Sequence, residues 1–505
     1  MRNYIFKRVS AVVLLSTIAI SGCKQDDYIN LTPEFTLDAL TNPSSIDQVE
    51  QVLNGAYANL RAANYYGSAS GTGGGAALMP DILGDDLYES RQSLANSKFM
   101  SDWAYQKNTE QIMLIYTQMY KPISTANIVL RDIDKFTTTA NVKRANRIKG
   151  QALALRALAH FDLFRYFADN YDRNSTTTLA VYYSKKFVVS SEEKPARMNN
   201  KEFYDNLFAD LAQAETLLGD IDAVINPTSA LTRPKLSLAA VHLLTARVNL
   251  YAGLYPAAIT AATKGLALAP PLATSQSAFS GMYNETNAGE IIWNVQFDPG
   301  QGGPTNLVYF ASQANAYYRV ATEVVNTTGT TGLIRNNDVR YAAYFTAQAN
   351  AQNPTSMALT KYKGKTTTSN ANANFIAMKT GELYLIRAEA YAKSSPAQDA
   401  LAMADLNTLR AARITGYVNE SLTGATLITA IANERRRELV GEGHRFFDLK
   451  RTTRVITRSP LTCGITTISP ASNCNLPTSA REWSFPYPDD VTKANTNIVQ
   501  NPLWR

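Results

Sequence analysis

A stretch of charged residues near the end of the chain, 433–451, reads NERRRELVGEGHRFFDLKR. Its carboxylates, its arginines and His444 are the residue types of an acid–base active site, of a polyanion-binding strip, or of internal ion pairs. Ile428, Ile431 and Leu439 recur at helical spacing, so the charges interrupt the apolar face of a helix. A charge buried without a partner costs several kcal/mol. We therefore interpret this charged block as a structural ion-pair brace, with an active site as the alternative.

The guanidinium fork of arginine suits carboxylates, and the charged block supplies both groups. The predicted brace residues are Glu434, Arg435, Arg437, Glu438, Arg445 and Asp448, with Glu442 and Arg451 as further partners. His444 stands alone beside a glycine turn, where a histidine is more often a hydrogen-bonded structural residue than a base. We assign no catalytic role to this block.

Other signals of catalysis are weak. Three histidines in 505 residues make a histidine-based metal site unexpected, and we predict no metal and no cofactor. The segment GSASG, 67–71, has alanine where a nucleophile elbow requires serine. Asp85 and Asp86 are adjacent acids, but neighbours in sequence need not face each other, and glycosidase geometry is not readable from them. We predict that the protein is not an enzyme, and a surface glycosidase is the least favoured alternative.

The first 22 residues resemble the signal peptide of a bacterial lipoprotein. A basic start is followed by an apolar run too short to span a bilayer, which ends in ISGC at 20–23. The resemblance implies cleavage before Cys23 and lipid on its sulfur, with residues 23–45 as a tether. An ordinary secretory leader is the alternative. Much of the net charge of +7 belongs to this leader, and no long Lys/Arg run follows, so we expect no nucleic-acid partner.

The two remaining cysteines, Cys463 and Cys474, form an even pair in a chain predicted to be exported. An oxidising compartment favours a disulfide between them. Two unpaired thiols are the alternative.

The rest of the chain is predicted to be mainly α. Apolar residues recur at helical spacing over about 108–270 and 376–451. Between them, residues 275–375 are rich in Asn, Thr, Gly and Gln and are predicted to form a large loop-rich insertion with a few short strands, one at EIIWNVQFD. Residues 452–505 are loop-rich again. We expect 46–505 to form one domain.

Two segments carry the spacing of a tetratricopeptide repeat. In the first, the small residues and the closing proline are Ala246, Ala258, Gly265 and Pro270. In the second, the matching positions are Ala388, Ala400 and Asn407, a degenerate copy. Small side chains allow antiparallel helices to approach closely, and proline ends the second helix. We predict a tetratricopeptide-like helical scaffold, with unrelated Ala-rich hairpins as the alternative.

Several motifs in order are similar to those of the SusD/RagB family of outer-membrane nutrient-binding lipoproteins. They are the lipoprotein leader, LMPDILGDDLYE, IKGQALALRALAHFDLFRYFAD, GELYLIRAEAYAK, the charged block and FPYPDDVTKANTNIVQNP. The last departs from the family at Tyr487 and Pro488, where an isoleucine-proline is usual. The resemblance implies a helical fold with tetratricopeptide-like repeats, a surface-exposed place at the outer membrane, and a SusC-like TonB-dependent transporter as partner.

Sugars present an apolar face and a rim of hydroxyls, which aromatic rings with nearby polar groups match. Candidate ligand residues in predicted loops are Tyr66, Tyr88, Arg91, Trp103, Asn315, Tyr317 and Tyr318. In the alternative interpretation each aromatic ring only packs against its neighbours. Trp293 lies in a strand-like run and is predicted to be core. We predict a protein that binds an oligosaccharide and delivers it to the transporter, with peptide binding, as in the RagB branch, as the alternative.

Overall fold

The computed structural model describes residues 41–68, 73–90, 98–188, 192–219, 231–298, 301–309, 316–347, 356–364, 372–459, 463 and 473–505. The predicted signal peptide, Cys23 and most of the predicted tether therefore lie outside the described residues, as do Arg91 and Asn315. Within them the chain is mainly helical, as the sequence predicts.

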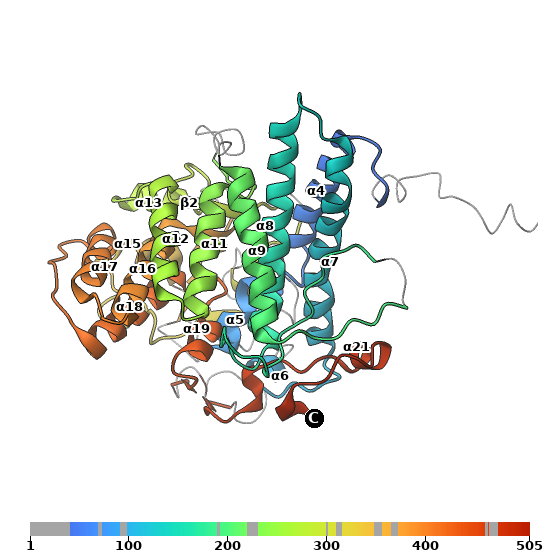
Figure 1. Cartoon of the computed structure of the whole chain (residues 1–505). Coiled ribbons are helices and arrows are strands. Elements are labelled where there is room, and N and C mark those ends of the chain that lie inside the picture. The colour runs from blue at the N-terminus through green and yellow to red at the C-terminus, as the bar shows by residue number, and fades with distance from the viewer. Residues whose placement is uncertain are drawn as a thin grey trace, which may run out of the picture.

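The long helices pack against one another and form the helical layer of the molecule (Figure 1). They are α4 (Ile46–Leu60), α7 (Glu110–Asp132), α8 (Val142–Phe167), α9 (Asn200–Leu218), α11 (Leu238–Tyr251), α12 (Tyr255–Leu268), α16 (Thr380–Lys393), α17 (Asp399–Arg413) and α18 (Gly424–Leu439). Local signals set several of their starts. The Ser45 side chain accepts a hydrogen bond from the Gln48 amide, and Asn199 forms a reciprocal capping box with Glu202.

Helix α8 lies among α4, α7, α9 and α11. Most of its residues are buried from Ile148 onward, as its nearly all-round Ala and Leu content predicts. A Cβ at Gly150 would lie 2.8 Å from Leu218 Cγ, so glycine allows α9 to approach at this point. A charge pair in this interface joins Arg156 and Asp210 through two 2.7 Å hydrogen bonds.

A neutral histidine sits in the same interface. His160 Nδ1 lies 2.8 Å from the Arg156 carbonyl oxygen, and its Nε2 accepts a 2.9 Å hydrogen bond from the Ser184 amide. Nε2 must therefore be unprotonated, and Nδ1 carries the proton. The ring stacks on Tyr183 at 3.8 Å. Burial lowers the pKa of His160 to about 3, so protonation opposes folding.

His160 should make the stability of the protein fall in mild acid. Because its folded pKa lies below the unfolded value of about 6.5, its stabilising contribution is present above that value and is lost as pH falls toward the folded value. We expect His160→Gln, which stays neutral, to make the slope of unfolding free energy between pH 6 and 4 shallower by about 1.4 kcal/mol per pH unit. Urea unfolding at a series of pH values measures this slope, and equal slopes in the two proteins would contradict it.

The predicted repeats correspond to the helix pairs α11/α12 and α16/α17, which meet through α12 and α16. Ala246, Ala258 and Ala388 are buried in these contacts. A Cβ at Gly265 would lie 2.9 Å from Leu383 Cδ2, so the small residue is needed between the two pairs. Ala400 is exposed, however, and Ala402 is the buried alanine of α17. The second copy is therefore out of step with the repeat spacing after the turn between its helices.

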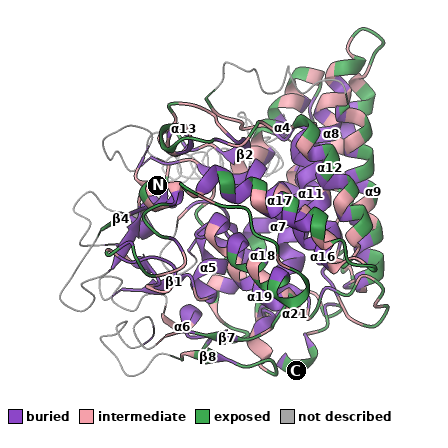
Figure 2. Ribbon diagram, turned by 90° about the vertical axis from the view of Figure 1, so that its left-hand side faces the viewer, coloured by how far each residue is buried: buried purple, intermediate pink, exposed green. Residues whose placement is uncertain are grey.

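Short strands lie beside the helices, and labelled strands of the largest sheet are toward the left of Figure 2. An antiparallel sheet has the order β1-β3-β5-β4, and two-stranded pairs join β2 with β6 and β7 with β8. The strands are β1 (Leu87–Glu89), β2 (Ile291–Val295), β3 (Tyr318–Val320), β4 (Phe345–Ala347), β5 (Met357–Leu359), β6 (Phe375–Lys379), β7 (Ile456–Thr457) and β8 (Asn475–Leu476). The predicted strand at EIIWNVQFD is β2, and its Trp293 is buried, as predicted.

Short helical segments make up the remaining described elements. They are η1 (Gly74–Leu78), α5 (Met79–Leu83), α6 (Lys98–Ser101), η3 (Ile133–Phe136), α13 (Gln276–Gly281), α14 (Thr305–Val308), α15 (Val339–Tyr344), η4 (Thr360–Tyr362), α19 (Arg445–Arg451), η5 (Arg481–Trp483), α21 (Asp489–Ala494) and η6 (Pro502–Trp504). Of these, α5 and α19 pack against each other although they are far apart in sequence. Their contact brings the charged block onto the early part of the chain.

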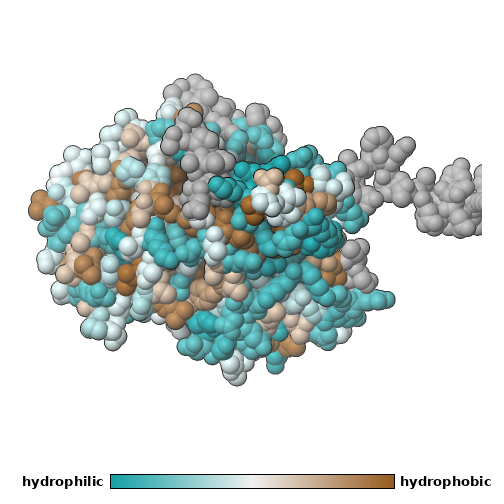
Figure 3. All heavy atoms as spheres, turned by 45° about the horizontal axis from the view of Figure 1, so that its top comes forward, coloured by the Kyte–Doolittle hydropathy of each residue, from teal (hydrophilic) through white to brown (hydrophobic). Residues whose placement is uncertain are grey.

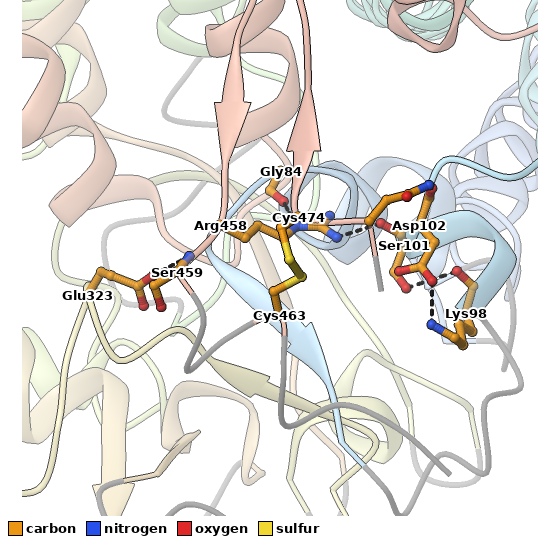
Figure 4. Close-up of a disulfide and its surroundings, with 10 residues drawn as sticks. Gly84, Lys98, Ser101, Asp102, Glu323, Arg458, Ser459, Cys463 and Cys474 are labelled. Atoms are coloured by element: carbon orange, nitrogen blue, oxygen red, sulfur yellow. Dashed lines mark hydrogen bonds and ion pairs between the residues drawn. A yellow bond between two sulfur atoms is a disulfide. The ribbon is translucent and has the colours of Figure 1, made fainter. Parts of the chain in front are cut away.

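Cys463 and Cys474 are joined by a disulfide beside α6 and β1 (Figure 4). Arg458 directly follows β7, and its amide donates to the Cys474 carbonyl oxygen at 2.8 Å. Its guanidinium donates to the carbonyl oxygens of Gly84 at 2.9 Å and Ser101 at 2.6 Å. The C-terminal loops are therefore fixed to the backbone that follows α5.

The surface of the molecule mixes hydrophobic and hydrophilic residues on the face that Figure 3 shows. On the face shown in Figure 3 the hydrophobic residues are scattered among hydrophilic ones. No helix in the described part of the chain combines the length and apolar composition that a bilayer-spanning helix needs.

Candidate functional site

The charged block forms the end of α18, a turn, and α19. Gly441 and Gly443 adopt φ values of +71° and +79°, which glycine reaches without strain. The carboxylate of Asp81, on α5, accepts 2.7 Å hydrogen bonds from the amides of both glycines. A Cβ on Gly443 would lie 2.1 Å from the Ala76 carbonyl oxygen. The turn thus depends on glycine and is held by a buried carboxylate from the early chain.

Glu438 lies at the centre of the brace and is fully buried. Its Oε2 accepts hydrogen bonds from Arg340 Nη1 and Arg413 Nε, both at 3.0 Å, and its Oε1 accepts one from Arg413 Nη2 at 3.0 Å. Arg340 belongs to α15 and Arg413 to α17. One carboxylate therefore joins three separate helices.

Glu434 is the second fully buried acid of α18. It accepts 2.7 Å hydrogen bonds from Arg340 Nη2 and Arg437 Nη1, and one of 2.9 Å from Arg410 Nε. Burial alone would raise the pKa of Glu434, but the arginines around it lower the pKa to about 2. The carboxylate is therefore charged in neutral solution and has no proton to give or take there.

Some ion pairs of the brace lie within the block, and others reach outside it. Arg437 pairs with Glu434, and Arg435 Nε donates to Asp448 at 2.8 Å. Arg445 instead pairs with Asp85, its Nε lying 2.5 Å from Oδ1, and Arg436 Nε donates to Asp86 at 2.6 Å. Asp85 and Asp86 are thus held by arginines of the charged block.

His444 has no feature of a general base. It is buried, and burial followed by the charges of Arg247 and Arg435 lowers the pKa of His444 well below its usual value. Its Nδ1 lies 3.3 Å from Arg435 Nη2, which can only donate. The imidazole is therefore a neutral acceptor within the ion-pair network.

Tyr66 was expected to face a ligand, and this expectation is wrong. Tyr66 is buried with its ring against Trp293 and Phe375, and its hydroxyl lies 3.2 Å from Asp162 Oδ2. Tyr65 donates to the same carboxylate oxygen at 2.9 Å. The two tyrosines therefore fill the core between α8 and the strands β2 and β6. The glycine-rich sequence beside them does not indicate this burial.

Trp103 is likewise buried, with 5% of its surface exposed. Its indole N–H donates to the Leu83 carbonyl oxygen at 2.9 Å, and the Arg458 guanidinium lies over its ring at 4.1 Å. One face of the ring is therefore used by a cation of the protein itself. The predicted role of Trp103 as an exposed sugar platform is wrong for this reason.

The other candidates gather on β1 and β3, which pair antiparallel so that Glu89 faces Tyr318. Tyr88 and Tyr318 are buried, and the Tyr88 hydroxyl lies 3.3 Å from Ser356 Oγ. Their predicted place in loops is therefore wrong, because both lie in strands of the sheet and are buried. Tyr317 is partly exposed at the start of β3. Of the predicted aromatic residues, it is the one that the structure leaves accessible.

A polar groove that the sequence did not indicate lies between α4 and β2. It encloses about 300 Å³, and its lining includes Tyr57, Trp293, Asn54, Gln296 and the ion pair of Arg61 with Asp298. Amides, a carboxylate and ring edges are groups that bind sugar hydroxyls. The residues come from segments far apart in the sequence, so no local motif reveals the groove.

The fold and the site define a class of protein: a helical-repeat scaffold that carries small sheets and loops, with an ion-pair brace that joins its helices. Two family models match the chain: the SusD family over residues 306–504, and a family described as starch-binding and associating with the outer membrane over 36–250. The chain belongs to the SusD/RagB family.

Known proteins resemble the chain over most of its length. A SusD-like protein of Formosa agariphila is 23% identical over 393 residues, which are 68% of this chain and 73% of the relative. A SusD superfamily structure from Bacteroides vulgatus covers 91% of this chain and 99% of its own at 22% identity and a TM-score of 0.74. A laminarin-binding SusD-like structure covers 90% and 99% at 18% identity and a TM-score of 0.63. These two structural likenesses establish the fold.

Proposed function

We propose that this protein is a glycan-binding lipoprotein of the outer-membrane surface, which captures an oligosaccharide and passes it uncleaved to a SusC-like TonB-dependent transporter. The observation that carries the proposal is the match of residues 36–250 to a family described as starch-binding and associating with the outer membrane. The laminarin-binding neighbour shares the fold. The signal-peptide resemblance and Cys23 supply the means of anchoring.

The proposed glycan surface lies around Tyr317, where β3 begins next to β1. A partly exposed tyrosine offers a flat apolar ring and a hydroxyl, which together match the two kinds of surface of a sugar. Arg91 and Asn315 remain proposed contacts. The ion pairs of the brace support binding without cleavage. Arginines hold the buried carboxylates described there, so these carboxylates are not available as the acid and the base of a hydrolysis reaction.

Electrophoresis in native gels that contain laminarin or starch tests the proposal. We expect one of these glycans to retard the protein, and Tyr317→Ala to weaken the binding about tenfold or more, since a central aromatic contact commonly contributes over 1 kcal/mol. Tyr255→Ala, which removes a partly exposed tyrosine of the helical layer, is the matched control and should bind like the parent.

Two other outcomes would replace this proposal. Binding of peptides in calorimetry, with no retardation by a broad set of glycans, would favour the peptide-binding function. Shortened glycan products after incubation would identify a glycosidase. The anchor and the partner are tested in cells: Cys23→Ala should leave the membrane fraction, and the parent protein should co-purify with a TonB-dependent transporter.

A further inference from the structure

A cavity beside the brace is not used by any function discussed so far. It lies between α18 and α19, with Glu389 and Lys393 of α16 on a third side, and encloses about 310 Å³. Buried residues such as Leu439 and His444 form its floor, and the exposed residues Thr429 and Asn433 lie at its rim. The volume is at the small end of ligand pockets, so the cavity suits one small molecule.

Arginines lining this cavity keep unused donors. Arg436 uses Nε and Nη2 on Asp86 and Asp85, and Arg445 uses the same two nitrogens on Asp85. Among the described residues, no partner accepts from Nη1 of Arg436 or of Arg445. Arg435, on the floor, also has an Nη1 without a hydrogen-bond partner in the described part of the chain. Guanidinium donors of this kind are strong sites for oxyanions.

Two of the acids that line the cavity have both oxygens occupied. Asp448 accepts from Arg435 and Arg451 on its two oxygens, at 2.8 Å and 2.9 Å. Glu389 accepts from both Nη groups of Arg451, at 2.6 Å and 2.8 Å, and from Lys393. These carboxylates therefore neutralise internal cations and leave the Nη1 groups of Arg436 and Arg445 to an incoming anion.

The rest of the cavity wall is apolar. Ile428, Ala432, Leu439 and Leu449 line it, and they come from both helices. An inorganic ion would leave this wall uncovered, whereas an organic body would cover it and remove apolar surface from water. The preferred ligand therefore combines an oxyanion with a compact carbon skeleton.

We propose that this cavity is a second binding site, separate from the glycan surface, that takes a small organic carboxylate about the size of one sugar ring. The carboxylate lies on Arg436 and Arg445, and the ring lies along Ile428 and Ala432. The proposal rests on the geometry of the brace. It is independent of whether the protein binds a neutral glycan at Tyr317.

Calorimetry with D-glucuronate tests this site. Glucose is the matched neutral probe, and acetate is the matched carboxylate without a ring. We expect glucuronate to bind at least about tenfold more tightly than either, since the charge-assisted contacts and the buried wall each contribute about 1 kcal/mol or more. Glucose binding as tightly as glucuronate would overturn the role of the arginines, and acetate binding as tightly would overturn the role of the wall.

Variants on α18 locate the binding. Ala432→Trp fills the cavity from its exposed rim and should abolish glucuronate binding, while the melting temperature stays near that of the parent. Thr426→Trp adds the same bulk at an exposed position of α18 outside this cavity and should bind like the parent. Arg436→Gln should weaken binding about tenfold. Unchanged binding by Ala432→Trp, or no glucuronate binding by the parent, would overturn the proposal.

Discussion

Gly443→Ala should prevent stable folding, with a loss of about 4 kcal/mol or more in the free energy of unfolding. The new Cβ would lie 2.1 Å from the Ala76 carbonyl oxygen and 2.9 Å from that of Ala77. Both neighbours are backbone, so neither moves aside as a flexible side chain does. The φ of +79° adds the cost of a left-handed conformation. Any shift that relieves the contact also pulls the Gly443 amide from Asp81.

Gly416→Ala is the matched control for this prediction. Gly416 also has a positive φ, +72°, but among the described residues no atom beyond its two chain neighbours lies within 4 Å of the position that its Cβ would take. We expect it to cost about 1–2 kcal/mol, the conformational part alone. Soluble yield and urea unfolding of the two variants measure the difference. If both variants lost the same stability, the close contact between the turn and the segment before α5 would be wrong.

Glu438→Gln should cost about 3–5 kcal/mol, because it removes one member of a buried network and leaves the others charged. The glutamine keeps the shape, but its amide group places donors opposite the donors of Arg340 and Arg413, which now touch the carboxylate at 3.0 Å. Burial raises the pKa of Glu438, and Arg413, Lys379 and Arg340 together lower it below its usual range, so the native protein holds this group charged.

A surface pair provides the control for Glu438→Gln. Glu215 and Lys264 pair at 2.7 Å with 34% and 52% of their side chains exposed. Exposed pairs contribute about 0–1 kcal/mol, so Glu215→Gln should change the unfolding free energy by about 0.5 kcal/mol or less. Denaturant unfolding at neutral pH compares the two variants. A loss under about 1 kcal/mol for Glu438→Gln would contradict the central place of Glu438 in the brace.

The helices could be predicted closely because their signals are local. The segment that begins at Asn200 carries its own capping box, and apolar spacing defines α9 to its last turn. The second repeat shows the limit of this reasoning. Ala400 stands at the expected interval, but the path of the chain between α16 and α17 turns Ala402 inward instead. Spacing predicts which face a helix buries only while the helix is continuous.

The candidate site was harder to predict, because its contacts join distant parts of the chain. Charges inside an apolar stripe indicated ion pairs, yet the arginines that hold Glu438 lie on other helices. No local pattern announces such partners. The prediction of exposed aromatic residues was wrong for a related reason. Tyr66 and Trp103 lie beside loop-like sequence, but tertiary packing buries them. Exposure is a property of the whole fold, so composition around a residue does not determine it.

The hydrogen bonds from Gly441 and Gly443 to Asp81 span 360 residues or more of chain. At about 5–20 residues per second, a ribosome needs roughly 20–70 s to make that interval, so the contact between α5 and the turn at 441–443 can form only after most of the chain has been made. The two separately matched halves are therefore not expected to be autonomous folding units.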